Sequence, residues 1–288
     1  MARIQFLFSI IINRISNQNK HCPYCGSNNT RLVQRKKILL ELRCCKQCSL
    51  MYRYPKDSVK KNMNYYQINY REGMTTNVPE LAELEEMLAS NFGTTEKDFS
   101  EKIDLVQRFS CGSNLLDFGC SWGFGLHQFR RAGFNAIGFD ISEPRARYGR
   151  EKLGVQIIDN LDELNNLRPA SFDVIFCNHV LEHLPTPRVA FDVFDRLLAA
   201  DGTLLIFVPN GGGENATRLG VRWGPMTGEK HVLTLTAMFF AKAFEKFNLS
   251  PIFSSSPYGG AELICAGPEG ILSGDELMVL AKRRRILA

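Results

Sequence analysis

The sequence predicts an α/β fold, in which helices cover both faces of a largely parallel sheet, preceded by a small cysteine-rich module. From Asn114 onward, short apolar runs alternate with amphipathic stretches of about 10 to 14 residues, the pattern of parallel strands joined by crossover helices. Two Cys-x-x-Cys pairs lie upstream, between Lys20 and Pro55, in a polar stretch too short to bury a core of its own. A chain of 288 residues has room for both parts.

Each predicted strand of the main domain is a short apolar run. The strands cover Leu115–Phe118, Ala136–Phe139, Val155–Ile158, Val174–Cys177 and Leu204–Val208. Helices are expected to begin near Gly123, Glu143, Leu161 and Pro187. A further helix over Thr236–Phe247 precedes two closing strands near Ile252 and Leu263. Apolar residues at helical spacing predict two helices between residues 79 and 109, the first from Leu81, Leu84 and Leu88 and the second from Ile103 and Val106.

These elements divide the chain into five segments. We expect an N-terminal apolar helix (1–19), the cysteine-rich module (20–56), a tyrosine-rich linker with helices (57–110), the main domain (111–270) and a C-terminal tail (271–288). The net charge of +5 is mild, whereas nucleic-acid-binding proteins usually carry a concentrated basic face, so the charge disfavours a nucleic-acid partner. The apolar run at 4–12 is far shorter than the roughly 20 residues of a membrane-spanning helix, so we expect a packing helix or a peripheral membrane contact.

The cysteine pairs form a strong zinc signal. Cys22, Cys25, Cys45 and Cys48 have the spacing Cys-x2-Cys-x19-Cys-x2-Cys, and two such knuckles complete a closed, structural tetrahedron. Cys44 is an alternative to Cys45, but only Cys45 keeps the two-residue gap to Cys48. A redox pair is the other interpretation, and two matched pairs in one module disfavour it. The remaining cysteines are mostly scattered, which indicates a reducing, cytoplasmic setting.

A glycine-rich turn follows the first strand of the main domain. The segment 115–125 reads LLDFGCSWGFG, and its glycines allow a backbone to approach a ligand closely. A dinucleotide fingerprint would require glycine at Ser121 and Phe124, and a phosphate-binding P-loop would require Gly-Lys-Ser/Thr, so neither motif is present. A turn without a ligand is the remaining alternative.

The segment instead resembles the first motif of class I S-adenosylmethionine-dependent methyltransferases, acidic-x-Gly-x-Gly-x-Gly, with Ser121 at the central glycine. The resemblance extends over approximately residues 100 to 266 and implies a Rossmann-like sheet that binds S-adenosylmethionine. Asp140 ends the second strand, 21 residues after Gly119, where a carboxylate would bind the ribose; a helix cap is its alternative role. Asn160, or Asp159 in its place, would contact the adenine. The implied cofactor-binding residues are Asp117, Gly119, Cys120, Gly123, Asp140, Ile141, Asn160 and Asn178.

The fourth strand is followed by Asn178-His179-Val180-Leu181-Glu182-His183, which resembles the fourth motif of the small-molecule enzymes of this superfamily. His179, Glu182 and His183 also have the spacing of some zinc peptidases, which the nucleoside-binding context disfavours. A neighbouring branch, the ubiquinone-type O-methyltransferases, uses a similar cluster for a divalent ion, so these three residues are a candidate second metal site. Local hydrogen bonding is the alternative.

His231 and Trp223 lie in the variable segment, which runs from the end of the fifth strand to the helix predicted over Thr236–Phe247 and is where related enzymes place acceptor contacts. An imidazole can accept a proton from an acceptor hydroxyl near neutral pH, so His231 is the first candidate for a general base and His179 the second. A structural role is the alternative for His231.

The order of zinc ribbon, tyrosine-rich connector and methyltransferase core resembles bacterial methyltransferases of surface-polysaccharide and sugar pathways. The resemblance implies methyl transfer to a small molecule, most simply a hydroxyl group of a sugar or glycan. Two alternatives are RNA base methylation, with the ribbon and the basic run at 282–285 holding RNA, and a noncatalytic binding protein that retains the fold.

Overall fold

The computed structural model describes residues 20–36, 39–69, 77–93, 95–228, 230–258 and 267–284. The chain divides into two compact units. The first comprises Met1–Asn62, His179–Asp192 and Ile206–Ala288, and the second comprises Met63–Asn178 and Val193–Leu205. The expected apolar helix at 1–19, including the segment 4–12, lies outside the described residues. Within the described ranges, no helix has the length and apolar character needed to cross a membrane.

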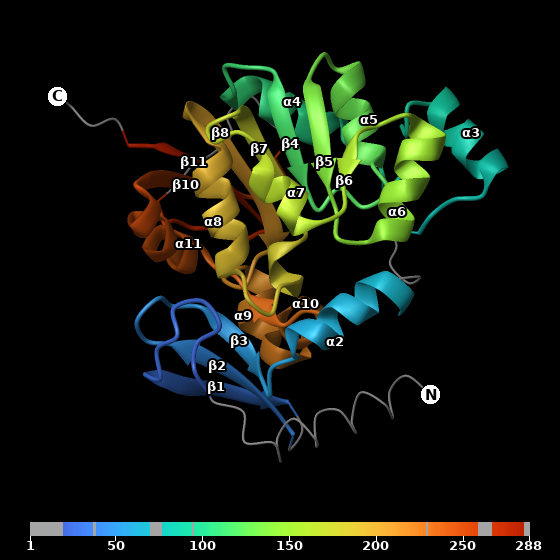
Figure 1. Cartoon of the computed structure of the whole chain (residues 1–288). Coiled ribbons are helices and arrows are strands. Elements are labelled where there is room, and N and C mark those ends of the chain that lie inside the picture. Colours follow the sequence, from blue (N-terminus) through green and yellow to red (C-terminus); the bar gives the residue numbers. More distant parts are fainter. Residues whose placement is uncertain are drawn as a thin grey trace. The chain divides into compact units, whose positions relative to one another are not determined.

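The second unit is built on parallel strands. Strand β4 (Asn114–Phe118) pairs in parallel with β5 (Asn135–Phe139) on one side and with β7 (Phe172–Asn178) on the other, and β6 (Ile157–Ile158) pairs with β5 (Figure 1). Both faces of β4 and β7 are buried, which explains their continuous apolar runs. Because the strands are parallel, their carboxyl ends lie at one edge of the sheet, where open α/β sheets generally bind their ligands.

The helices of this part begin close to the predicted positions. They are α3 (Leu81–Ala89), α4 (Ser100–Phe109), α5 (Phe124–Arg131), α6 (Glu143–Tyr148), α7 (Leu161–Asn166) and α8 (Arg188–Leu197). The linker also contains α2 (Val59–Asn64) and the π-helix η1 (Tyr65–Asn69), and a second π-helix, η2 (Gly149–Leu153), continues α6. The predicted α/β fold of alternating strands and helices is therefore confirmed.

The large sheet has seven strands in the order β10-β11-β8-β7-β4-β5-β6. Strand β8 (Leu198–Pro209) passes from the second unit into the first, and β10 (Leu249–Ser255) pairs antiparallel with β11 (Glu276–Arg283) through seven residue pairs, from Leu249↔Arg283 to Ser255↔Leu277. The segment 271–288, expected as a tail, thus contains a strand, which corrects that boundary. Strand β10 agrees with the strand expected near Ile252, whereas the strand expected near Leu263 lies outside the described residues.

A second, four-stranded sheet lies within the first unit. Strands β1 (Thr30–Lys36), β2 (Leu40–Cys45) and β3 (Met51–Tyr54) come from the cysteine-rich module, and β9 (Leu233–Thr234) comes from the variable segment. The same unit contains α9 (Glu214–Leu219), α10 (Gly224–Thr227), α11 (Ala237–Phe244) and the short 3₁₀ helices η3 (Leu181–His183), η4 (Gly220–Arg222) and η5 (Glu245–Phe247).

Tyr24 anchors the module within this unit. Its ring makes edge contacts with Phe191 and Phe239, and its hydroxyl donates a hydrogen bond to the carbonyl of Ala243 at 3.3 Å. Burial of this aromatic side chain raises the pKa of its phenol well above the ordinary value. The cysteine-rich module therefore shares an apolar core with α8 and α11.

Candidate cofactor site and metal centre

The glycine-rich turn between β4 and α5 has the backbone geometry of a close ligand approach. Gly119 and Gly123 have φ angles of 86° and 84°, in the region that favours glycine. A Cβ at Gly123 would lie 2.9 Å from Cγ2 of Val155, so the position also requires glycine for space. The amides of Gly119 and Cys120 donate to the carbonyl of Phe139 at 2.6 and 3.1 Å, which fixes the turn against the end of β5.

Ser121 replaces the central glycine of the motif, yet it also has a positive φ of 54°. Its amide donates to Oδ2 of Asp140 at 2.7 Å, and its hydroxyl accepts a hydrogen bond from Nη1 of Arg145 at 3.0 Å. Arg145 is 3% exposed, so it places a buried positive charge beside this turn. These bonds offset the left-handed conformation, which costs a non-glycine residue about 1 to 2 kcal/mol.

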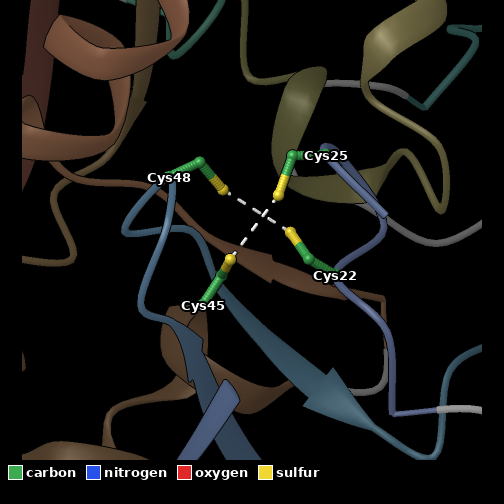
Figure 2. Close-up of side chains that lie close together, drawn as sticks. All are labelled: Cys22, Cys25, Cys45 and Cys48. Carbon is green, nitrogen blue, oxygen red and sulfur yellow. Dashed lines mark hydrogen bonds between the residues drawn. The ribbon is translucent and has the colours of Figure 1, made fainter. Parts of the chain in front are cut away.

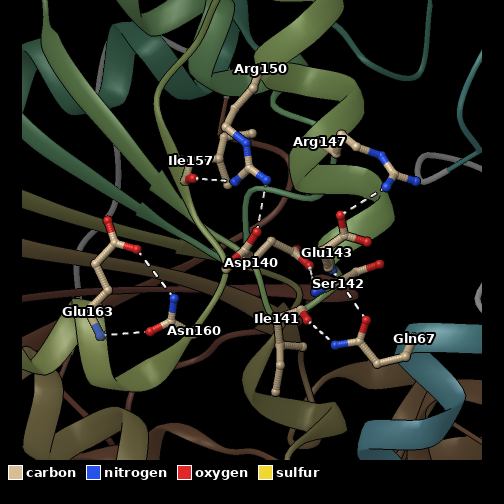
Figure 3. Close-up of polar contacts among 11 residues, drawn as sticks. Gln67, Asp140, Ile141, Ser142, Glu143, Arg147, Arg150, Ile157, Asn160 and Glu163 are labelled. Carbon is tan, nitrogen blue, oxygen red and sulfur yellow. Dashed lines mark hydrogen bonds and ion pairs between the residues drawn. The ribbon is translucent and has the colours of Figure 1, made fainter.

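Asp140 organises the edge of the sheet. Its carboxylate accepts backbone hydrogen bonds on both oxygens, from Ser121 at 2.7 Å and from Ser142 at 2.8 Å. The side chain is 9% exposed, and its pKa is raised because burial disfavours the charged form, against the opposing effects of the two amides and of Arg145. Figure 3 shows Asp140 among the polar residues that follow β5. A carboxylate oxygen can accept a second bond, so Asp140 can bind hydroxyl groups while it holds the turn.

Asp117 lies one strand away, in the centre of the sheet, opposite Gly138 of β5 and Phe176 of β7. Its pKa is raised to about 8, first because of burial and second because of the charge of Asp140. A ligand that brings a positive charge to this position would favour the carboxylate form. The two acids and the glycine turn are therefore one site within the second unit.

The other expected cofactor residues make local contacts. Oδ1 of Asn160 accepts the amide of Glu163 at 2.8 Å and caps α7 (Figure 3), while Asp159 forms an ion pair with Arg150 at 2.9 Å. Oδ1 of Asn178 accepts from Nζ of Lys102 at 2.5 Å. The adenine contact expected from Asn160 remains a prediction, and it would have to share this side chain with the helix cap.

Three residues of the site were missed from the sequence. The amide of Gln67, in η1, donates to the carbonyl of Ile141 at 2.5 Å, and its oxygen accepts from the amide of Glu143 at 3.3 Å (Figure 3). Lys102 and Arg145 are the other two. No local motif marks these residues, because each lies on a helix or connector whose contact with the strand ends depends on the tertiary fold.

The four predicted cysteines converge in the first unit. Their sulfur atoms all lie within 4.8 Å of one another, with Sγ atoms 3.5 Å apart in the pairs Cys22–Cys48 and Cys25–Cys45 (Figure 2). A tetrahedral zinc site with Zn–S bonds of about 2.3 Å requires S···S distances of about 3.8 Å, so the cluster fits the ion closely. The thiol of Cys48 lowers the pKa of Cys22 to about 5, which favours a thiolate there. Cys44 is not part of the cluster, as expected.

His179 directly follows β7 and has a φ angle of 53°. Its Nδ1 lies 3.2 Å from Oε1 of Glu182, and its Nε2 lies 2.5 Å from Oε1 of Glu276 at the start of β11. The side chain is 40% exposed; desolvation by the surrounding protein lowers the pKa of this imidazole, but the two carboxylates more than offset that effect and raise it to about 9. His179 is therefore held as a cation between two acids at neutral pH.

A different trio has the geometry of a metal site. Ligand atoms of Glu182, His183 and His231 lie within 4.8 Å of one another. Nδ1 of His183 lies 3.1 Å from the carbonyl of Lys230, and Nδ1 of His231 lies 3.0 Å from that of Pro225. A carbonyl only accepts, so each Nδ1 atom carries a proton, and in a neutral imidazole Nε2 is then the atom that can bind a metal ion. The structure thus replaces His179 of the predicted cluster with His231.

Glu182 completes this arrangement. The side chain is 2% exposed, and its Oε2 atom is buried without a hydrogen-bond partner among the described residues. Burial alone would raise its pKa, but the hydrogen bond from His179 and the electrostatic effect of the neighbouring imidazoles outweigh burial and lower the pKa to about 2. Trp223, the other residue singled out in the variable segment, packs instead against the apolar cluster of Leu42, Val221 and Met226.

Comparisons with known proteins identify the family of this chain. The model of the family described as "Methyltransferase domain" matches residues 94–252, more than half of the chain. Ubiquinone biosynthesis O-methyltransferases of Xylella fastidiosa and Methylococcus capsulatus are 30% and 29% identical over 105 residues, which is 34% of this chain and 43% and 44% of theirs. The chain thus matches less than half of the length of these relatives.

Solved structures share the fold at low identity. A S-adenosylmethionine-dependent methyltransferase from Thermotoga maritima, described as a possible histamine N-methyltransferase, has a TM-score of 0.51 at 14% identity, over 71% of this chain and 96% of that one. Magnesium protoporphyrin IX methyltransferase from Synechocystis has a TM-score of 0.50 at 15% identity, over 79% and 100%. The chain belongs to the methyltransferase-domain family and has the Rossmann-like fold of the S-adenosylmethionine-dependent enzymes.

Proposed function

We propose that this protein transfers a methyl group from S-adenosylmethionine to a hydroxyl group of a small molecule, most simply a sugar or glycan. The observation that carries the proposal is the position of Asp140, which ends β5 and holds the glycine turn of β4 with both carboxylate oxygens. The names of the curated relatives support an oxygen acceptor. The resemblance of the ribbon-and-core arrangement to enzymes of polysaccharide pathways supports a sugar.

The cofactor supplies a methyl group that its sulfonium has already activated. Asp140 would bind the ribose hydroxyls, and Asp117 would face the cationic amino-acid part, which favours its ionised form. The acceptor oxygen attacks the methyl carbon as the carbon–sulfur bond breaks, and the bonding electrons stay on sulfur. The protein mainly contributes alignment, because fixing two reactants in register accounts for much of the rate gain in such a transfer.

His231 is the preferred base for the hydroxyl proton. Burial and the neighbouring His183 lower its pKa, which favours the neutral imidazole that a base requires. The hydrogen bond to Pro225 fixes the proton on Nδ1, which leaves Nε2 to accept another. His179 suits this role less well, since its two carboxylate partners keep it protonated.

The proposal includes a structural zinc ion and a second metal site that is only a candidate. The four cysteines of the ribbon would hold a structural zinc ion with no open position. A divalent ion at Glu182, His183 and His231 is a second candidate, supported by the unpartnered Oε2 atom of Glu182. An ion there would make His231 a ligand in place of a base. Metal analysis of the purified protein distinguishes these two roles of His231. One equivalent of metal per chain, held by the cysteines, agrees with His231 as a base, and two equivalents agree with His231 as a ligand.

The proposal also includes a reducing, cytoplasmic setting, because the zinc site needs reduced thiols. We expect S-adenosylhomocysteine to form from S-adenosylmethionine when sugar nucleotides or glycan fragments are supplied, and chromatography with mass detection measures it. Stable S-adenosylmethionine binding without any turnover on hydroxyl acceptors would support the noncatalytic alternative instead.

A further inference from the structure

The zinc ribbon and the variable segment form one continuous sheet. Strand β3 of the ribbon pairs antiparallel with β9, and the partners are Met51↔Thr234 and Tyr52↔Leu233. Nearly 180 residues of sequence separate these strands. Strand β9 begins two residues after His231, so the ribbon sets the position of the backbone that carries this imidazole.

Arg53 strengthens this connection on both sides of His231. Its amide donates to the carbonyl of Val232 at 2.9 Å, and its guanidinium Nη1 donates to the carbonyl of Gly228 at 2.9 Å. The side chain is 2% exposed and forms an ion pair with Asp57, which holds the guanidinium in place. A buried, charge-assisted bond to a loop carbonyl is a strong restraint on that loop.

Further contacts join the ribbon to the same segment. Oε1 of Gln34 in β1 accepts the amide of Val221 at 3.1 Å. Leu42 of β2 is buried with Ala216, Val221 and Met226, and Met51 packs against this cluster.

Two more hydrogen bonds hold the backbone of the residues that lie beside His231 in the candidate trio. The amide of Val232 donates to the carbonyl of Glu182 at 2.9 Å, and Nδ2 of Asn62, in α2, donates to the carbonyl of His183 at 3.0 Å.

We infer that the zinc ribbon is the platform of the acceptor side of this enzyme, and that Arg53 is a positioning residue that acts through the backbone on either side of His231. The part of this inference that concerns catalysis rests on the proposed function. The cofactor residues Asp117 and Asp140 belong to the other compact unit, so the ribbon should influence acceptor turnover and leave cofactor affinity unchanged. A ribbon that merely stabilises the chain, or that binds RNA, would not show this selectivity.

The test compares Arg53→Met, which keeps the aliphatic stem and removes the donors, with Arg53→Lys, which keeps a positive charge and a donor. Lys46→Met, at an exposed position of the same ribbon, is the matched control. Hydrogen exchange followed by mass spectrometry reports the protection of residues 226–235. We expect at least tenfold faster exchange there in Arg53→Met, partial recovery in Arg53→Lys, and unchanged exchange over β5.

Zinc content and cofactor affinity are measured on the same samples. We expect one zinc ion per chain and S-adenosylmethionine affinity within twofold of wild type, with turnover at least tenfold lower at saturating cofactor. Gln34→Ala provides a second variant that leaves Arg53 intact, in case Arg53→Met does not fold. Wild-type exchange at 226–235 in zinc-bound variants would overturn the inference, as would faster exchange with unchanged turnover. Failure of the wild-type protein to transfer methyl groups would overturn the proposed function instead, and the exchange data would still decide whether the ribbon holds the segment.

Discussion

Replacement of Asp140 should weaken S-adenosylmethionine binding more than any other single change at the sheet edge. The carboxylate holds two backbone amides, at 2.7 and 2.8 Å, and in our proposal it also binds the ribose. Loss of one charge-assisted hydrogen bond to the ribose costs about 1.5 to 3 kcal/mol. That range corresponds to about 10- to 150-fold weaker binding. Asp140→Ala also leaves the amides of Ser121 and Ser142 without their acceptor, so the loss should lie at the upper end.

Calorimetric titration with S-adenosylmethionine measures the effect directly. Asp140→Asn keeps the shape and one acceptor oxygen, but it turns a donor toward one of the two amides, so its affinity should fall between those of wild type and Asp140→Ala. Asp162→Asn, at an exposed acid on α7, is the control and should bind like wild type. Unchanged affinity in a folded Asp140→Ala protein would refute the assignment of the ribose site.

Three further predictions concern the metal, the pH dependence and the base. Metal analysis of protein purified under reducing conditions should find at least one zinc ion per chain, and Cys45→Ser should lose it, because the closed site needs four thiolates; a metal-free, folded wild type would contradict the site. The Asp117 carboxyl has a pKa of about 8 in the folded chain and of ~3.9 in the unfolded chain, so the folded state binds its proton more tightly. This preference stabilises the fold fully below pH ~3.9, and the stabilisation is lost as the pH rises through 8. Denaturant titrations should therefore give a smaller free energy of unfolding at pH 9 than at pH 6, and an Asp117→Asn variant with the same pH dependence would show that another group is responsible. His231→Asn should lower turnover by ~10²- to 10⁴-fold and leave cofactor affinity intact; if His179→Asn alone lowers turnover, the base is misassigned.

The alternating pattern of the main domain contained enough information to place its strands and helices. The runs at 115–118, 136–139 and 174–177 became β4, β5 and β7, because a strand buried on both faces must be apolar along its whole length. The segment 276–283 was predicted as part of a tail but forms β11. It is an antiparallel strand that depends on pairing with β10, and its basic end resembles a solvated tail.

The candidate sites also differ in whether the sequence alone could predict them. The cysteine cluster follows from local spacing, since each knuckle presents two thiolates by itself. The trio of Glu182, His183 and His231 could not be predicted, because it depends on the hydrogen bond from the amide of Val232 to the carbonyl of Glu182, across 50 positions of sequence. Sequence spacing favoured His179 as the third member, but both of its ring nitrogens already have carboxylate partners, Glu182 and Glu276, and Glu276 lies in a strand that was not expected.

The most direct test of the proposed activity follows a labelled methyl group. The protein is incubated with S-adenosylmethionine labelled in the methyl group and a fractionated cell extract, with and without prior ribonuclease treatment, and Asp140→Ala serves as the inactive control. Our account predicts that label enters a small-molecule or glycan fraction, that ribonuclease does not reduce it, and that the variant transfers far less. Label confined to a ribonuclease-sensitive fraction, or equal transfer by the variant, would contradict it.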